Sequence, residues 1–326
     1  MYWVNPEVEL LKRALEIYSP TGNTDELGDF FVEWCTEHGM EAKIVNSMLV
    51  INPEASTLLM LGHMDTVPGE LPVEQNGNNL TGRGAADAKG PLCAAISTLT
   101  RHPELCKHVQ IVAAHDEEGR STAALYIREH YSERPVIILE PSTWEGITLS
   151  YMGRLSIRCT SECPPSHSGH NSPFASEELA RVWNILAADY LTRICNISAS
   201  STTGNIFLDI RFRETKPEDI LAKIPKEINV DILEKTPPYT AEKNTKLVRA
   251  FLKAVRDAGG TPRFKNKTGT SDMNVLGSEW TSAPMLAYGP GDGRVGHTNS
   301  EQIEITDYEK GIEVLENALL HLVESD

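Results

Sequence analysis

The sequence predicts an α/β protein with a mixed, largely parallel sheet flanked by helices and with an inserted α+β domain. Two observations predict this fold class. In residues 1–151 and again in residues 239–326, short apolar strand-like runs alternate with helix-like segments, which is typical of a layered α/β domain. In residues 152–238 the pattern changes to strands in which apolar and polar residues alternate. We therefore expect one α/β domain in two parts, interrupted by a second domain.

The first part of the chain contains a regular succession of helix and strand signals. Residues 5–18 carry apolar side chains at helical spacing and are expected to form the first helix. Thr24 is expected to cap a second helix that ends near Gly39, because acidic residues follow it in the first turn. The remaining expected elements are strands at 41–51, 57–61, 109–114 and 135–140, and helices at 90–101 and 120–130.

The middle of the chain has the signals of a β-α-β-β-α-β segment, similar to a ferredoxin-like sandwich. Its expected elements are strands at 153–161, 204–213 and 227–233, and helices at 175–190 and 217–225. A loop rich in Pro, Ser and His lies at 163–173. After Pro237 and Pro238 the α/β pattern resumes, with a helix expected at 243–258, a strand at 283–288 and a helix at 306–323.

The composition excludes several classes of protein. The chain has 326 residues with 30 Lys and Arg against 46 Asp and Glu, a formal net charge of −16, and no basic stripe, so we expect no nucleic-acid partner. No apolar run approaches the ~20 residues that a membrane span needs. The N-terminus lacks a charged stretch followed by an apolar one, which predicts a cytoplasmic protein without a secretory signal. The six scattered cysteines form no C-x-x-C pair and are expected to be buried thiols in a reducing compartment.

Residues of the types that bind metal ions follow several of the expected strands or lie in glycine-rich loops. They occur in G-H-M-D, G-R-G-A-A-D-A-K-G, H-D-E-E-G, V-I-I-L-E and G-D-G-R-V-G-H-T. In open α/β sheets, sites form at the carboxyl ends of strands, so these segments are expected to meet at one edge of the sheet. The residues concerned are His63, Asp65, Asp87, Glu117, Glu118, Glu140 and His297.

The residue types suit a centre with two divalent cations. Zinc prefers imidazole nitrogen and carboxylate oxygen where thiolates are absent, and a two-oxygen carboxylate such as Asp87 suits a position between two cations. A further carboxylate must accept the proton of the attacking water, and the adjacent Glu117 and Glu118 could divide the duties of base and ligand. Each motif alone is more often a solvated strand end or helix start, so the prediction depends on their conjunction. The G-R-G-A-A-D loop lacks the full G-x-G-x-x-G pattern of a nucleotide site.

Taken together in this order, the five motifs resemble those of the co-catalytic zinc aminoacylase and carboxypeptidase family. That family includes succinyl-diaminopimelate desuccinylase, acetylornithine deacetylase and glutamate carboxypeptidase, and the resemblance covers essentially the whole chain. It implies a catalytic domain in two parts, residues 1–151 and 239–326, and a dimerisation or lid domain at 152–238. It also implies two zinc ions per subunit, with cobalt or manganese as alternatives for the same ligand set.

The resemblance implies a role for each residue of the metal-binding type. His63 and Glu140 resemble ligands of one cation, Glu118 and His297 resemble ligands of the other, and Asp87 resembles the carboxylate that bridges both.

Two further residues of the same segments carry implied roles. Asp65 resembles the residue that orients the imidazole of the neighbouring histidine ligand. Glu117 resembles the general base.

The inserted segment carries the implied contacts to substrate. In the family, a histidine from this domain reaches the active site of the other subunit of a homodimer. His167 fits that position best, and His170 is the alternative within P-P-S-H-S-G-H. Asn205 and Arg211 match positions that contact polar groups of the substrate. The loop of Gly269, Thr270 and Ser271 resembles the one that receives a carboxylate, and its backbone N–H groups can bind an anion.

Three strings resemble one branch of the family more closely. G-R-G-A-A-D-A-K-G-P-L, K-T-G-T-S-D-M-N and Y-G-P-G-D-G are similar to the amino-group-carrier-protein lysine or ornithine hydrolases of lysine and arginine biosynthesis. These release lysine or ornithine from the C-terminal glutamate of the carrier. The alternatives are a deacylase of small molecules such as N-acetyl-ornithine, N-acetyl-lysine or N-succinyl-diaminopimelate, then an aminopeptidase or dipeptidase, and outside enzymes a metal-binding protein without catalysis.

An acidic carrier would have to bind this acidic chain through a local basic patch. The candidates for that patch are Lys89, Arg154, Lys265, Lys267 and Arg294.

Overall fold

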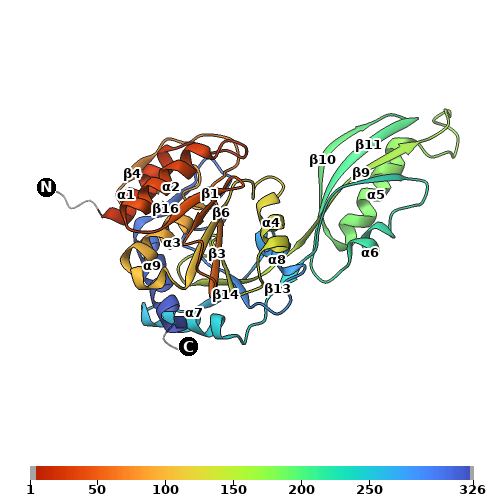
Figure 1. The fold of residues 1–326 in the computed structure, drawn as a ribbon. Helices are drawn as coiled ribbons and strands as arrows, with labels where there is room; N and C mark the ends of the chain where they lie inside the picture. Colours follow the sequence, from red (N-terminus) through yellow and green to blue (C-terminus); the bar gives the residue numbers. More distant parts are fainter. Residues whose placement is uncertain (1–4, 324–326) are drawn as a thin grey trace. The chain divides into compact units, whose positions relative to one another are not determined.

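The computed structural model describes residues 5–323, which form two compact units (Figure 1). Unit 1 consists of residues up to 149, 241–266 and from 275 onwards, and unit 2 of residues 150–240 and 267–274. The outer limits of the predicted catalytic domain, at residues 1–4 and 324–326, lie outside the described part of the chain. No helix within residues 5–323 combines the length and the apolar composition needed to cross a membrane.

A nine-stranded sheet, most of which belongs to unit 1, has the order β1-β2-β6-β3-β7-β15-β8-β13, with β14 paired to β8. The strands β6, β3, β7 and β15 run parallel to one another, and the pairs at both ends of the sheet are antiparallel. The predicted mixed α/β class is therefore confirmed. The strands are β1 Ala42–Val45, β2 Met48–Ile51, β3 Leu58–His63, β6 Val109–Ala114, β7 Val136–Ile138, β8 Gly146–Tyr151, β13 Tyr239–Thr240, β14 Arg263–Lys267 and β15 Met285–Ala287.

The four parallel strands are the most buried part of the sheet, since every residue of β3, β6, β7 and β15 is buried. Strands covered on both faces have continuous apolar sequences rather than alternating ones, which is why L-L-M-L and V-I-I were recognisable as strands. A small second sheet in the order β16-β5-β4 joins Gln302–Glu304, Asn79–Thr81 and Glu74–Asn76. This sheet fixes the chain after His297 beside the chain that leads to Asp87.

Helices pack against the large sheet and against one another. α3 contacts β3 and β6, while α9 contacts both α3 and α7 and lies beside α3 in Figure 1. The helices of unit 1 are α1 Pro6–Glu16, α2 Asp25–Glu37, α3 Lys89–Arg101, α4 Thr122–His130, α7 Lys246–Asp257 and α9 Ile305–Val323, with a short 3₁₀ helix at Pro103–Leu105. The helix α8, Asp272–Gly277, is divided equally between the two units.

Two expectations for the N-terminal part need correction. The single strand expected at 41–51 is a hairpin of β1 and β2, because Asn46 and Ser47 both adopt positive φ and reverse the chain. Thr24 precedes α2 as expected, but its side chain makes no capping hydrogen bond, because Thr24 has a nearly helical backbone rather than the extended one of a capping residue.

Unit 2 is a ferredoxin-like sandwich. Its sheet has the order β10-β11-β9-β12 with every neighbouring pair antiparallel. The elements are β9 Gly153–Glu162, α5 Ala175–Asp189, β10 Leu191–Ala199, β11 Thr203–Phe212, α6 Pro217–Leu221 and β12 Asn229–Thr236. Strand β10 was not predicted from the sequence, because all but one of its residues are exposed and no alternation of apolar residues marks it.

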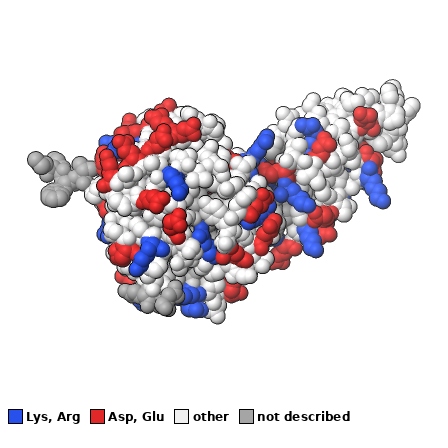
Figure 2. Space-filling view, in the orientation of Figure 1, with Lys and Arg blue, Asp and Glu red and all other residues white. Residues whose placement is uncertain are grey.

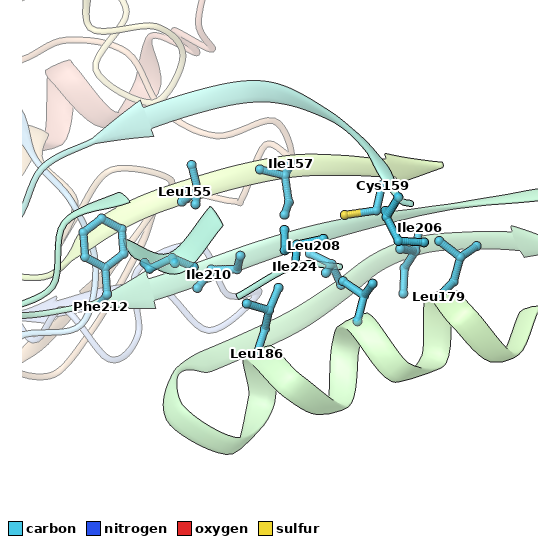
Figure 3. Packing of buried hydrophobic residues seen from close by; sticks show 13 residues of the cluster. Leu155, Ile157, Cys159, Leu179, Leu186, Ile206, Leu208, Ile210, Phe212 and Ile224 are labelled. Atoms are coloured by element: carbon cyan, nitrogen blue, oxygen red, sulfur yellow. The ribbon is translucent and has the colours of Figure 1, made fainter. Parts of the chain in front are cut away.

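The core of unit 2 lies between the sheet and its helices (Figure 3). Alternate residues of β9 and β11 point from the sheet towards α5, where they meet Leu179, Val182 and Leu186. Figure 3 shows Leu155 and Ile157 of β9 on the same side of the sheet as Leu208 of β11. The opposite face of these strands therefore carries the polar members of the alternation, which include Asn205 and Arg211.

Candidate metal centre

Parallel strands end together at one edge of unit 1 and place five of the seven predicted residues there. His63 is the last residue of β3 and is paired with Ala114, the last residue of β6. Glu117 and Glu118 lie in the loop after β6, and Glu140 lies in the loop after β7. Because these strands run in the same direction, their carboxyl ends converge, and the loops that follow them share one site.

Two loops complete this edge. Asp87 lies in the glycine-rich turn directly before α3, and its peptide bond to Ala88 is cis. His297 lies in the loop between β15 and β16 with a φ of 62°. The preceding Gly296 lies so close to Asp87 that an added Cβ would stand 2.9 Å from Asp87 Oδ2. A side chain at position 296 would therefore displace the carboxylate.

The side chains form two groups, each of which could hold one metal ion. His63, Glu117 and Glu140 make up the first group, and Asp87, Glu118 and His297 make up the second. In each group the nitrogen and oxygen atoms offered as ligands lie within 4.8 Å of one another. We call them the buried group and the open group, because the His63 side chain is 2% exposed and the His297 side chain is 50% exposed.

Asp87 lies between the two groups. Its Oδ1 is 3.6 Å from His63 Nε2, and its Oδ2 is 3.4 Å from His297 Nε2. On the outer sides, His63 Nε2 is 3.8 Å from Glu140 Oε1, and His297 Nε2 is 2.6 Å from Glu118 Oε1. One carboxylate therefore turns one oxygen to each group, which is the geometry that a shared ligand requires.

Asp65 makes hydrogen bonds to residues of both groups. It is fully buried, and its oxygens accept hydrogen bonds from the backbone N–H of Glu117 at 3.0 Å and of Glu118 at 3.2 Å. The Thr21 hydroxyl donates a third hydrogen bond at 2.7 Å. His63 Nδ1 lies 2.8 Å from the Asp65 carbonyl and 3.5 Å from its carboxylate, so Nδ1 carries the proton and Nε2 presents its lone pair to the site.

The electrostatics of the site favour positive charge. Burial opposes a charge on His63, yet the carboxylates of Asp65 and Asp87 outweigh it and hold the pKa of His63 well above its usual range. Hydrogen bonds to Asp87 and Glu118 raise the pKa of His297 to about 10. Burial would raise the pKa of Asp65, but its hydrogen bonds with His63 and Thr21 lower it.

The donor set fits divalent cations. His63 Nε2 is buried and makes no hydrogen bond within residues 5–323, although a buried polar atom normally has a partner. The five carboxylates at this edge carry a formal charge of −5, which two divalent cations would offset with +4. Imidazole nitrogen with carboxylate oxygen is the set that zinc prefers in the absence of thiolates, and cobalt and manganese also accept it.

Sequence reasoning missed three residues that support this centre. Thr21 binds Asp65, and Arg83 forms a buried ion pair with Glu301. Nothing in the sequence marked Thr21. Arg83 lies in the G-R-G-A-A-D string and Glu301 lies four residues after His297. Their positions in the sequence do not predict that the two side chains form an ion pair.

The substrate-contacting residues expected in unit 2 lie in two places. Arg211 on β11 and Thr270 are brought together, with Arg211 Nη1 3.4 Å from Thr270 Oγ1. Asn205 precedes Arg211 in β11 and lies on the same face of the sheet as Arg211. Gly269 and Ser271 flank Thr270, and Ser271 is buried.

His167 lies in the exposed loop before α5, where its Nδ1 accepts the Gly169 N–H at 3.0 Å. The ring of His170 is 5.7 Å away.

The predicted basic patch needs correction at Lys89. This residue is 1% exposed, and its Nζ donates to the carbonyls of Ala14 at 3.0 Å and Ile17 at 2.6 Å. Burial lowers the pKa of Lys89 to about 8. Lys89 therefore ties α1 to the start of α3 and offers nothing to a surface partner.

The fold and the convergent ligand-type side chains define a class of protein, the metal-dependent hydrolases of α/β architecture. The model of peptidase family M20/M25/M40 matches residues 59–321. The chain belongs to this family.

Relatives and solved structures agree with that assignment. A protein of Pyrococcus furiosus is 34% identical over 98% of each chain. A protein of Deinococcus radiodurans, named as a LysW-lysine hydrolase, is 32% identical over 97% of this chain and 96% of its own. An M20 family metallo-carboxypeptidase of Sulfolobus solfataricus is similar in fold, with a TM-score of 0.79, 17% identity and coverage of 98% of this chain and 100% of that one.

Proposed function

We propose that this protein is a hydrolase with two metal ions that releases lysine or ornithine from the C-terminal glutamate of an amino-group carrier protein. The observation that carries the proposal is the full-length similarity to a LysW-lysine hydrolase at 32% identity, together with the two adjoining groups of ligand-type side chains. Zinc is the proposed native cation because the ligand atoms are imidazole nitrogens and carboxylate oxygens.

The chain's own residues divide the work at the carboxyl edge of the sheet. When bound, two cations would activate a water molecule and polarise the carbonyl of the scissile amide. Glu117 takes the proton of that water and returns it to the leaving amine of lysine, a general acid–base role. Asp65 keeps His63 in the tautomer that presents Nε2, and it holds the backbone of Glu117 at the same time.

The position of Glu117, the proposed base, would also allow it to be a metal ligand. Glu117 belongs to the buried group with His63 and Glu140, so its carboxylate is near enough to bind a cation. The assignment as base follows from family resemblance and from the adjacent Glu118, which contacts His297 and fills the ligand position of the open group. A carboxylate already engaged with a cation is a poor acceptor for the proton.

The proposed substrate is tested by competition between amides. The purified, zinc-loaded enzyme is offered carrier-bound lysine beside N-acetyl-lysine, N-acetyl-ornithine and N-succinyl-diaminopimelate, and the release of each amino acid is followed by mass spectrometry. We expect the carrier adduct to have the highest kcat/KM. A preference for any free acyl substrate would replace the carrier proposal with the small-molecule deacylase.

Binding of the carrier to this acidic chain depends on local charge. Figure 2 shows Asp and Glu gathered over α1 and α2, a face that would repel an acidic partner. Of the expected cations, Arg154 is bound to Asp209 at 2.7 Å and to Glu234 at 2.7 Å, and Arg294 is paired with Asp292. Arg211 is likewise paired with Asp209, at 3.1 Å, and Lys265 Nζ donates to the Thr143 hydroxyl at 3.1 Å.

A homodimer through unit 2 is the proposed assembly. β10 is an edge strand whose Leu191, Ile194 and Ile197 are 43%, 43% and 52% exposed, so apolar side chains and unpaired backbone groups lie on the same edge. In such a dimer, His167 serves the active site of the other subunit. Its Nδ1 already accepts the Gly169 N–H, which leaves Nε2 as the donor to the substrate carbonyl.

The dimer proposal has a matched control within the same sheet. Changing Ile194 and Ile197 to Lys should convert the protein to a monomer with little activity, measured by light scattering and by turnover. The opposite edge strand, β12, carries Ile232 and Leu233 at 49% exposure each, and changing both to Lys should leave the dimer intact. A β10 variant that stays dimeric would refute this interface.

A further inference from the structure

A buried ion pair lies directly behind Asp87. Arg83 Nη1 is 2.8 Å from Glu301 Oε2, and the two side chains are 5% and 1% exposed. A buried ion pair is tolerated only where further hydrogen bonds satisfy its remaining atoms. The partners of those remaining atoms therefore show what the pair holds in place.

Glu301 holds the turn that carries Asp87. Its Oε1 accepts the backbone N–H of Ala86 at 3.2 Å and of Asp87 at 3.0 Å. The carbonyl of Glu301 in turn accepts the Gly82 N–H at 3.4 Å, next to the pairing of β16 with β5. The position of the Asp87 backbone is thus set by a residue more than 200 positions later in the chain.

Arg83 extends the same network to two other loops of the site. Its Nε donates to the Gly69 carbonyl at 2.8 Å, in the segment that follows His63. Its Nη1 also donates to the Thr298 carbonyl at 3.1 Å, next to His297. The pair therefore links three segments, and each of them carries a residue of the proposed metal centre.

The network acts on the one carboxylate that faces both groups. Asp87 turns Oδ1 towards His63 and Oδ2 towards His297, at 3.6 and 3.4 Å. A tilt of its backbone would shorten one of these distances and lengthen the other. The two N–H groups held by Glu301 are the contacts that oppose such a tilt.

We propose that Arg83 and Glu301 are positioning residues that fix Asp87 as the shared ligand of two cations. This inference rests on the proposed dimetal function. The negative charge of Glu301 attracts the N–H groups of the turn, and Arg83 neutralises that charge so that it does not repel the Asp87 carboxylate.

The test compares Glu301→Ala and Glu301→Gln with a matched control. Glutamine keeps an oxygen for the N–H groups of Ala86 and Asp87, whereas alanine removes it. The control is Glu133→Gln, because Glu133 Oε1 also accepts two consecutive backbone N–H groups, those of Ser282 at 2.5 Å and Ala283 at 2.8 Å, at the opposite edge of the sheet. Cobalt(II) binding is measured by competition with a chromophoric chelator, and the visible absorption spectrum of the loaded protein is recorded.

We expect each variant to lose metal affinity in proportion to the contacts it loses with the backbone N–H groups of Ala86 and Asp87. Glu301→Ala should weaken cobalt binding by about 10–100-fold and change the visible spectrum, the range typical of residues that orient metal ligands. Glu301→Gln should recover most of that affinity and spectrum. Glu133→Gln should match the wild-type protein in both measurements.

Three results would overturn the inference: a folded Glu301→Ala protein with wild-type affinity and spectrum, a Glu301→Gln protein as impaired as the alanine variant, or an equal loss in Glu133→Gln. If the alanine variant does not fold, the wild-type, Glu301→Gln and Arg83→Met proteins decide the question. The positioning role then requires that Arg83→Met lower the affinity more than Glu301→Gln does. Wild-type protein that takes up only one cobalt ion would instead refute the dimetal proposal itself.

Discussion

The buried group and the open group use similar ligand types but differ in their access to water. His63 and Glu140 are both buried and Glu117 is partly exposed, whereas in the open group Asp87 and Glu118 are partly exposed and half of the His297 side chain is exposed. The effective dielectric constant is lower around the buried group, so its charges interact more strongly with a cation and with one another. The difference predicts that a cation in the buried group would be held more firmly than a cation in the open group, which solvent can reach.

The prediction with the largest expected effect tests whether Glu117 of the buried group is the general base or a metal ligand. Glu117→Gln should lower kcat by about 10²–10⁴-fold, because glutamine cannot accept the proton of the attacking water. The variant should still bind two zinc ions, as measured by metal analysis after gel filtration.

The neighbouring carboxylate provides the control for that prediction. Glu118→Gln should lose the cation of the open group, because Glu118 Oε1 contacts His297 Nε2 at 2.6 Å. If Glu117→Gln released a cation as readily, Glu117 would be a ligand of the buried group, and another residue would have to serve as base.

A second prediction addresses the residue that serves both groups. Asp65→Asn should weaken binding of both cations by about 10–100-fold, since it disturbs the backbone N–H contacts of Glu117 and Glu118 and the orientation of His63. Isothermal titration of the metal-free protein with zinc measures both affinities.

Asp116 is a suitable comparison for this change. Its carboxylate accepts hydrogen bonds from Thr122 and Ala123 at the start of α4. Asp116→Asn should lower the melting temperature and leave zinc affinity unchanged. An Asp65→Asn protein that loses stability alone would show that Asp65 is merely structural.

A third prediction concerns the removal of metal. Release of zinc to excess chelator should follow two phases, with the open group losing its cation about tenfold faster, because water replaces ligands more easily at a partly exposed site. Stopped-flow absorbance of a chromophoric chelator resolves the phases. His297→Ala should abolish the fast phase, and a single phase in the wild-type protein would show that the two groups do not differ.

The fold was predictable where burial imposes a pattern on the sequence. Strands β3, β6 and β7 are buried throughout and so have continuous apolar sequences. β10 was not predictable, because an exposed edge strand is free of that constraint. The hairpin of β1 and β2 was not predictable, because its turn consists of only Asn46 and Ser47, neither of which is a glycine, although both adopt positive φ.

The residue types of the site were predictable because they lie in distinctive strings at strand ends. The structure brings all seven to one edge, while their individual roles stay predictions. The supporting contacts were not predictable: Arg83 and Glu301 are separated by 218 positions, and Thr21 and Asp65 by 44. Such contacts arise from three-dimensional packing, which leaves no local periodicity in the sequence.

The smallest expected effect tests how rigidly Asp65 must be held. Thr21→Val removes one hydrogen bond to Asp65 Oδ2, a loss of about 1 kcal/mol that corresponds to about a fivefold fall in zinc affinity. Both groups should be affected equally, because Asp65 binds the backbone of Glu117 and of Glu118.

Thr36→Val is the matched control for this change, since Thr36 donates only to the Val32 carbonyl within the exposed part of α2. It should leave zinc affinity unchanged. If Thr21→Val weakened the open group alone, Asp65 would support the two groups unequally. The buried group and the open group would then differ in their support by Asp65 as well as in their access to water.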